Sequence, residues 1–181
     1  MRFEDFDNDG KKDLIVAQGH VLDNVDQIDP SKHYRELPLL AMNRGERFER
    51  ADSGLTSAVA GRGLAIVDLN NDGSTDAVIT VLGGHPLILL NHANNAHWLT
   101  VSLRGTRSNR DGAGAIVRVN GQTQYASSAG SYLSASDKRV HFGLGSSTTA
   151  SLEVTWPSGT RQVLKDVKVD RFMEVVEPTK P

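Results

Sequence analysis

Short apolar or alternating segments, separated by polar, glycine-containing and proline-containing turns, run along the whole chain. Residues 97–104 show the pattern most clearly, because Leu99, Val101 and Leu103 alternate with other side chains. Alternation with a period of two is typical of a strand with one buried face. Such segments predict strands at 14–18, 36–43, 63–68, 76–82, 87–91, 97–104, 115–119, 122–127, 139–142, 152–156, 161–164 and 172–176. No segment has a convincing helical period, so the pattern predicts an all-β chain, with residues 19–35 as a long surface loop.

Two of the turns share one acidic pattern. Residues 5–13 (DFDNDGKKD) and 68–76 (DLNNDGSTD) each place Asp or Asn at positions one, three, five and nine, with glycine at position six. Hard cations such as Ca2+ prefer six to eight oxygen ligands, and alternating acidic residues on a tight turn supply several of them. Glycine permits the sharp bend, and the carbonyl at position seven, which is Ser74 in the second loop, commonly completes that side of the cage. The sequence therefore predicts two calcium-type loops.

The two loops begin 63 residues apart and are copies of one internal repeat. They are not EF-hands, because Val16 and Ile79 occupy position twelve, where an EF-hand has a bidentate Glu. The β-branched and apolar residues after each loop predict strands rather than helices. A metal loop on each hairpin and a long repeat period together predict β-propeller blades. An Asp-rich solvated turn is the simpler alternative, since Asp, Asn and Gly favour turns for backbone reasons alone.

Beyond residue 95 the acidic pattern stops, while short strands continue at the spacing of a β-sandwich. The polar stretch 91–96 is the predicted domain boundary. We therefore expect propeller-type repeats at 1–95, a C-terminal β-sandwich-like domain at 96–177 and a tail at 178–181. Two blades are fewer than a closed propeller needs, so we expect open sheet edges and self-association through them.

Composition and charge add limits on partners and on cellular location. The chain of 181 residues has a formal net charge of -2 and no cysteine, so it has no disulfide framework and its charge gives no reason to expect nucleic acid. No apolar run approaches the ~20 residues needed to cross a bilayer. Calcium sites of moderate affinity are useful mainly outside the cytosol. We therefore expect an extracellular or periplasmic location, and expect this chain to be the C-terminal part of a longer secreted polypeptide whose leader precedes Met1.

Several strings resemble known families. The paired DFDNDGKKDL and DLNNDGSTDA loops resemble FG-GAP/VCBS repeats, the calcium-binding blades of integrin-type β-propellers. The strings HWLTVSLRGTRSNRDGAGAIVRV, GSYLSASDKRVHFGLG and LEVTWPSGTRQVL, in that order, resemble the ASPIC/UnbV domain. Propeller repeats followed by this domain are the architecture of the cartilage-acidic-protein family, and the resemblance covers nearly the whole chain.

The resemblance implies five metal ligands in each loop. They are the side chains of Asp5, Asp7, Asp9 and Asp13 with the Lys11 carbonyl, and the side chains of Asp68, Asn70, Asp72 and Asp76 with the Ser74 carbonyl. The amide at position 70 leaves the second loop with three carboxylates against four, so charge alone would make the first site tighter. The first loop, however, lies at the start of the sequence, where the entering strand is almost absent. We therefore expect fraying there and a better-formed second site.

Histidine and serine side chains offer weaker candidates for chemistry. The six histidines lack metal-ligand spacing, and we expect each of them in a turn or on the surface. Three serines, Ser131, Ser134 and Ser136, would form a hydrolase site with His141 only if the fold brought them together, because a catalytic triad is defined by geometry.

Aromatic and basic side chains are the remaining candidates. We expect Trp98 and Trp156 in the core of a sandwich rather than, with Tyr132, on an exposed platform for sugar or protein. A patch for RNA would use five cations, for which a solvated face is the simpler expectation: Arg107, Arg110, Arg118, Lys138 and Arg139.

These observations together predict a non-enzymatic, calcium-binding interaction or adhesion module. Ca2+ would stabilise the hairpin loops because it binds only the folded form. The partner would be a protein or a glycan. An accessory region of a larger secreted enzyme is the alternative function, and an RNA-binding protein is a second alternative.

Overall fold

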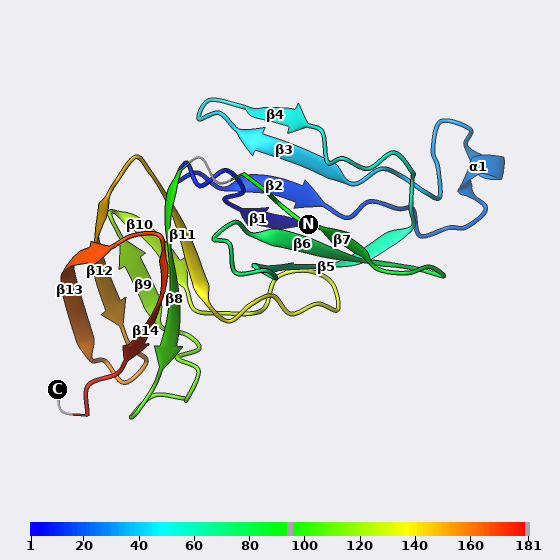
Figure 1. The fold of residues 1–181 in the computed structure, drawn as a ribbon. Coiled ribbons are helices and arrows are strands. Elements are labelled where there is room, and N and C mark those ends of the chain that lie inside the picture. The colour runs from blue at the N-terminus through cyan, green and yellow to red at the C-terminus, as the bar shows by residue number, and fades with distance from the viewer. Residues whose placement is uncertain (94–95, 180–181) are drawn as a thin grey trace.

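The structure is a computed structural model that describes residues 1–93 and 96–179. The chain is nearly all β, with 45% of its residues in strands and 2% in helix, which confirms the predicted fold class. The strands form four sheets, and none of the sheets in the described residues closes into a barrel or propeller (Figure 1). The predicted boundary between residues 95 and 96 and the end of the predicted tail at 178–181 fall on residues outside the described part.

The repeat region, residues 1–91, consists of two sheets. The first sheet has the order β1-β2-β3-β4 and comprises β1 (Arg2–Glu4), β2 (Asp13–Val16), β3 (Leu39–Asn43) and β4 (Phe48–Ala51). The second sheet has the order β5-β6-β7 and comprises β5 (Gly61–Val67), β6 (Asp76–Val81) and β7 (Leu87–Leu89). All pairs in these sheets are antiparallel, and each acidic loop joins the first two strands of its sheet.

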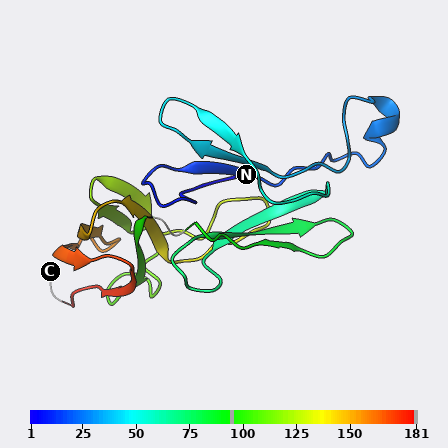
Figure 2. The same cartoon turned by 45° about the horizontal axis from the view of Figure 1, so that its top comes forward.

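Two short elements differ from the sequence-based expectation. β1 pairs with β2 in full register, so the chain enters the first loop from a formed strand, and the expected fraying is wrong for this structure. The segment 19–35 is largely a loop, as predicted, but it contains one turn of helix, α1 (Val25–Ile28), held by the burial of Val25. This segment projects away from the sheets in both ribbon views (Figures 1 and 2).

The two sheets of the repeat region pack face to face. The first sheet contributes Ile15 and Met42 to their shared core, and the second sheet contributes Leu64, Ile66 and Ile79. Each strand turns alternate side chains to this core, as the predicted period of two requires.

The C-terminal unit is a sandwich of the other two sheets. One sheet has the order β10-β9-β12-β13 and comprises β9 (Ile116–Val119), β10 (Gln122–Tyr125), β12 (Thr149–Thr155) and β13 (Arg161–Lys168). The other has the order β11-β8-β14 and comprises β8 (His97–Arg104), β11 (Val140–Gly145) and β14 (Arg171–Val176), with β14 parallel to β8. Trp156 and Phe142 lie in the core between them, so Trp156 is a core residue as expected.

Glu177 fixes the end of the sandwich to the loop that follows β8. Its carboxylate is buried and accepts hydrogen bonds from the backbone amides of Thr106, Arg107 and Ser108 and from the hydroxyl of Ser158. Burial alone would raise the pKa of Glu177, but these hydrogen bonds hold the charged form and lower the pKa to about 2.

In the part of the chain that the structure describes, no helix has the length and apolar character needed to cross a membrane.

The Glu177→Gln variant should lose stability at neutral pH, because an amide cannot replace a carboxylate that accepts from three amides. A carboxyl whose pKa is lower in the folded state stabilises the protein above its unfolded pKa and loses that contribution as pH falls. The difference in unfolding midpoint between wild type and variant should therefore be full at pH 6 and shrink between about pH 4.5 and 2. Thermal unfolding of both proteins between pH 6 and pH 2 measures this difference in midpoint. A difference that stays constant over that range would contradict the prediction.

Candidate metal centre

The two acidic loops have the same backbone conformation. Asn8 and Asn71, at position four of each loop, have φ of 58° and 57°, and Gly10 and Gly73, at position six, have φ of 91° and 89°. Asn tolerates this left-handed region and glycine adopts it without cost. The backbone conformation therefore explains why Asn stands at position four and glycine at position six. The repeat found in the sequence is thus a repeat of conformation as well.

The first aspartate of each loop holds the turn from inside. Asp5 accepts hydrogen bonds from the amides of Asp9 (3.1 Å) and Gly10 (2.8 Å), and Asp68 accepts the equivalent pair from Asp72 (3.2 Å) and Gly73 (2.9 Å). Asp5 and Asp68 are both buried.

The ninth residue of each loop ties the loop to its own sheet. Asp13 accepts from the amides of Phe6 at the start of the loop (2.9 Å) and Asn43 at the end of β3 (2.8 Å). Asp76 accepts in the same way from Leu69 and Asn91, both at 2.8 Å.

An asparagine at or just after the end of the third strand of each repeat holds the acidic loop, and sequence reasoning missed both of these residues. Asn43 Nδ2 donates to the Lys12 carbonyl at 3.1 Å, and Asn91 Nδ2 donates to the Thr75 carbonyl at 3.3 Å. Each asparagine therefore binds its loop through both its backbone amide and its side chain. The available signal was an asparagine closing an apolar segment in both repeats, LLAMN and LILLN.

Three carboxylates of the first loop lie close together. Asp5, Asp7 and Asp13 each place one oxygen within 4.8 Å of the others. Among the described residues, no equivalent group forms in the second loop, where the Asn70 amide donates to the Asp72 carboxylate at 2.7 Å. Asn70 supplies an amide where the first loop has the Asp7 carboxylate, and β1 orders the first loop, so the expectation that the second site is better formed stays a prediction.

The electrostatics of the first loop suit a divalent cation. Burial, together with the neighbouring carboxylates of Asp9 and Asp13, raises the pKa of Asp5 to about 7, and burial raises the pKa of Asp13 as well. Asp7 Oδ1 is buried and has no hydrogen-bond partner. Crowded oxygens with an unsatisfied acceptor are the donor set that Ca2+ prefers, so the residues present fit the metal.

The remaining predicted ligands lie at the rim of the loops. Asp9 accepts from the Lys11 amide and pairs with the Lys11 ammonium at 2.6 Å, so its carboxylate lies outside the group of three. Asp72 accepts from the Ser74 amide in the same way, while the Ser74 hydroxyl donates to the Ala93 carbonyl.

The C-terminal sandwich packs directly on the first loop through Asn8. His141 Nε2 lies 2.7 Å from Asn8 Oδ1, His141 Nδ1 lies 2.8 Å from Thr100 Oγ1, and Asn8 Nδ2 donates to the Gly73 carbonyl in the second loop. Gly145 donates its amide to the Asn8 carbonyl. Because an amide oxygen only accepts, His141 donates from Nε2 and accepts from Thr100 at Nδ1.

His141 is therefore a buried junction residue, and the expectation of a turn or surface position was wrong for it. Burial lowers the pKa of His141 to about 4, so the ring is neutral at neutral pH. Both ring nitrogens are occupied by Asn8 and Thr100, and the nearby Ser136 hydroxyl instead accepts from the Ile66 amide.

Glycine and tryptophan make the close contacts of this junction. A Cβ on Gly143 of β11 would overlap Asp5 Oδ2 and would lie 2.5 Å from Asn8 Cα. A Cβ on Gly73 would overlap the Trp98 ring. Trp98 thus covers the second loop rather than filling the sandwich core, which corrects its predicted role.

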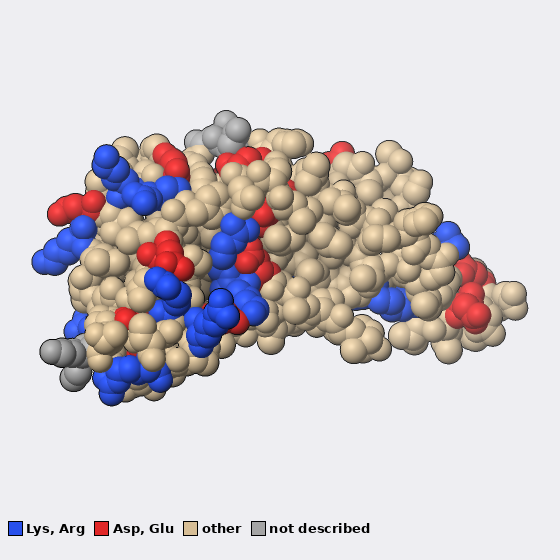
Figure 3. All heavy atoms as spheres, turned by 60° about the horizontal axis from the view of Figure 1, so that its bottom comes forward, with Lys and Arg blue, Asp and Glu red and all other residues tan. Residues whose placement is uncertain are grey.

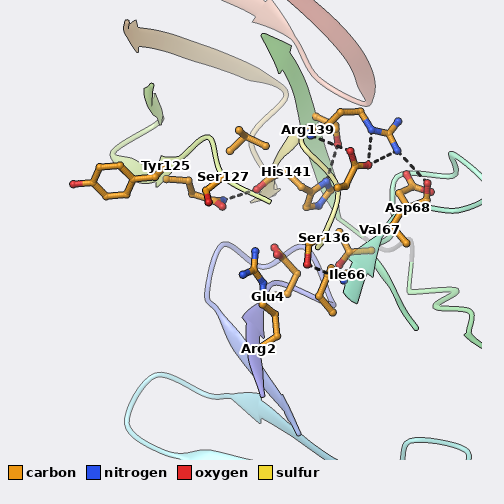
Figure 4. A pocket seen from close by; sticks show the side chains of 15 residues that line it. Arg2, Glu4, Ile66, Val67, Asp68, Tyr125, Ser127, Ser136, Arg139 and His141 are labelled. Carbon is orange, nitrogen blue, oxygen red and sulfur yellow. Dashed lines mark hydrogen bonds and ion pairs between the residues drawn. The ribbon is translucent and has the colours of Figure 1, made fainter. Parts of the chain in front are cut away.

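Arg139 holds the second loop from the sandwich side. Its guanidinium donates to the Asp68 carbonyl (Figure 4). It also donates to Asn71 Oδ1 and pairs with Asp137. The small cleft beside it, with Arg2 and His141 among its lining residues, has a volume of about 50 Å³, which is room for a few water molecules.

Two of the other four cations considered for an RNA patch are paired with carboxylates. Arg118 lies 3.2 Å from Glu153, and Lys138 pairs with Asp111. Lys and Arg gather over the sandwich end of the molecule in Figure 3, with acidic side chains interspersed among them.

Comparison with protein families agrees with this organisation. A family model of the FG-GAP-like repeat matches residues 5–79, and the ASPIC and UnbV model matches residues 105–181. The chain carries an FG-GAP-like repeat region followed by an ASPIC/UnbV domain. A search of curated proteins found no match. FG-GAP repeats are typical of extracellular, propeller-type modules.

The Gly143→Ala variant should weaken the packing of the ASPIC/UnbV domain on the first loop. Gly143 has no positive φ, so the added methyl acts only through its contacts with backbone and carboxylate. We expect a loss of about 1–3 kcal/mol in unfolding free energy, measured by denaturant titration. Gly84→Ala is the matched control, because its Cβ meets only the Val81 side chain, at 3.1 Å or more. Equal stability of the two variants would contradict the tight junction.

Proposed function

We propose that this protein is a non-enzymatic, calcium-binding interaction module that acts outside the cytosol. The observation that carries the proposal is the group formed by Asp5, Asp7 and Asp13, whose oxygens lie within 4.8 Å of one another. The unpartnered Asp7 Oδ1 and the burial that raises the pKa of Asp5 to about 7 support it, because a bound cation would supply Asp7 Oδ1 with a partner and would offset the cost of burying the charged Asp5.

Ca2+ would supply the positive charge that this group lacks. The chain's own residues already hold the loop in shape, since Asp5 and Asp13 each accept two backbone amides. A loop ordered before the metal arrives loses less conformational entropy on binding. Arg44 at 3.1 Å from Asp7 and Lys11 beside Asp9 would be the competing cations at the rim.

The second loop would be the weaker of the two sites. Asn70 replaces a carboxylate, and its amide is bound to Asp72. The oxygens available to a metal there are those of Asp68, Asn70, Asp72 and Asp76 and the Ser74 carbonyl. Fewer charges at a calcium site give lower affinity.

Metal in these loops would stiffen the junction between the repeats and the ASPIC/UnbV domain, because Asn8, between two candidate ligands, contacts that domain. A stiff junction presents a single surface to a partner, which we propose to be a protein or a glycan. An accessory role in a larger secreted enzyme stays a prediction.

Thermal unfolding in EDTA, in Ca2+ and in Mg2+ tests the metal site. A metal at about 100 times its dissociation constant adds about 2.7 kcal/mol per site to the unfolding free energy. That gain corresponds to a rise of roughly 5–10 °C in midpoint for a chain of this size. We expect this rise with Ca2+ and little change with Mg2+. No rise with Ca2+, or an equal rise with Mg2+, would contradict the proposal.

Exchanging the residues at position three of the two loops distinguishes their contributions to the Ca2+-dependent rise in midpoint. Asp7→Asn gives the first loop the residue of the second and should remove most of the Ca2+-dependent rise without lowering stability in EDTA, because it relieves repulsion between carboxylates. Asn70→Asp should enlarge the rise. Asp23→Asn, at an exposed position in the 19–35 loop, is the control and should leave the rise unchanged.

A further inference from the structure

We propose that Arg44 is a built-in counter-ion of the first acidic loop and that it makes this loop selective for divalent over monovalent cations. The inference rests on the calcium site proposed above and concerns the regulation of that same site. Arg44 stands in the turn between β3 and β4, directly after Asn43, the asparagine that holds the loop. Its side chain reaches back over the loop, so that Nη1 lies 3.1 Å from Asp7 Oδ2.

The Arg44 guanidinium lies between two carboxylates. While Nη1 contacts Asp7, Nε lies 3.9 Å from Oε2 of Glu49 on β4. Arg47 donates to the other oxygen of Glu49, Oε1, at 2.8 Å, so the two arginines address different oxygens. The side chains of Arg44 and Glu49 are 47% and 44% exposed. The guanidinium can therefore turn from Asp7 toward Glu49 without opening the core.

The two oxygens of Asp7 have different surroundings. Oδ2 accepts from Arg44, whereas Oδ1 is buried and has no partner. The guanidinium thus neutralises one charge of the group formed by Asp5, Asp7 and Asp13 without taking the inner oxygen. Coulomb attraction grows with the charge of the ion, so Na+ or K+, which brings no more charge than the guanidinium, gains little at this group. A divalent cation brings twice that charge and keeps a surplus of attraction.

The second repeat supports a match between Arg44 and Asp7. Position three of the loop and the residue after the asparagine differ together, since the first repeat has Asp7 and Arg44 and the second has Asn70 and His92. Arginine is a permanent cation, whereas histidine is not one at neutral pH. The loop with the additional carboxylate therefore also has the additional cation.

Glu49 gives the guanidinium a second partner when the loop holds metal. A divalent ion at Asp7 repels the Arg44 guanidinium, and Glu49 Oε2 is the nearby carboxylate oxygen toward which it can turn. Glu49 is thus a positioning residue that favours metal binding through Arg44, outside the set of ligands.

Isothermal titration of the full chain with CaCl2, at about 20 mM and about 150 mM KCl, tests the counter-ion. Arg44→Gln should bind Ca2+ about three- to tenfold more tightly at the lower salt concentration, because the competing charge is gone. It should also lose more affinity than the wild type at the higher salt concentration, because K+ then gathers at carboxylates that lack their counter-ion. Asp7→Asn identifies the part of the signal that belongs to the first loop.

Arg50→Gln is the matched control for net charge. Arg50 is an exposed arginine on β4, and the alternation of the strand turns its side chain to the face opposite Glu49. Its loss should change the Ca2+ dissociation constant less than about twofold at either salt concentration. Thermal unfolding in EDTA gives a readout without metal, in which Arg44→Gln should lower the midpoint more than Arg50→Gln does.

A double-mutant cycle tests the role of Glu49. Glu49→Gln should weaken Ca2+ binding at least about twofold in the wild-type background and should have no effect in the Arg44→Gln background, because it acts only through Arg44. Arg44→Gln with unchanged or weaker Ca2+ binding, with the salt dependence of the wild type, or with an undiminished effect of Glu49→Gln would overturn the inference. A wild type that binds no Ca2+ overturns the calcium site and this inference with it, whereas Ca2+ binding that is insensitive to Arg44 overturns this inference alone.

Discussion

Buried aspartates that accept hydrogen bonds from backbone amides hold the two acidic loops, and the rest of the repeat region is built around them. Asp5 and Asp68 close each turn from inside, while Asp13 and Asp76 bind each turn to the strand beyond it. Removing carboxylates from water is costly unless their oxygens are satisfied. The amides satisfy most of them, and the residual negative charge in the first loop is what makes that loop attractive to a cation.

The ASPIC/UnbV domain uses these loops as its docking surface. Gly143 approaches Asp5, Trp98 covers Gly73, and Arg139 binds the carbonyl of Asp68. The same loop residues therefore form the turn, provide the candidate metal ligands and contact the C-terminal domain. Whatever orders the loops also orders the contact with the domain, because both equilibria involve one set of backbone positions.

The sequence allowed the strands, the repeat and both loops to be predicted because these depend on local patterns: alternation of apolar residues, and Asp, Asn and Gly at fixed spacing. Burial of His141 could not be predicted, because its partners Asn8 and Thr100 are 133 and 41 residues away along the chain. The count of carboxylates in the sequence favoured the first loop, but the expectation that its start is frayed outweighed that count. The group of three carboxylates depends on β1, a strand too short for its pattern to be recognised, and on the directions in which the side chains point.

Asn8 and Asn71 occupy the same position of the same repeat with the same backbone angles, yet their surroundings differ. Asn8 forms hydrogen bonds through its side chain and its carbonyl with Gly73 in the second loop and with His141 and Gly145 in β11. Asn71, in contrast, receives one hydrogen bond from Arg139. Two copies of a repeated motif are therefore no longer equivalent when different parts of the chain pack against each of them. In this protein the left-handed turn is common to both copies, whereas the contacts that the C-terminal domain makes with each copy differ.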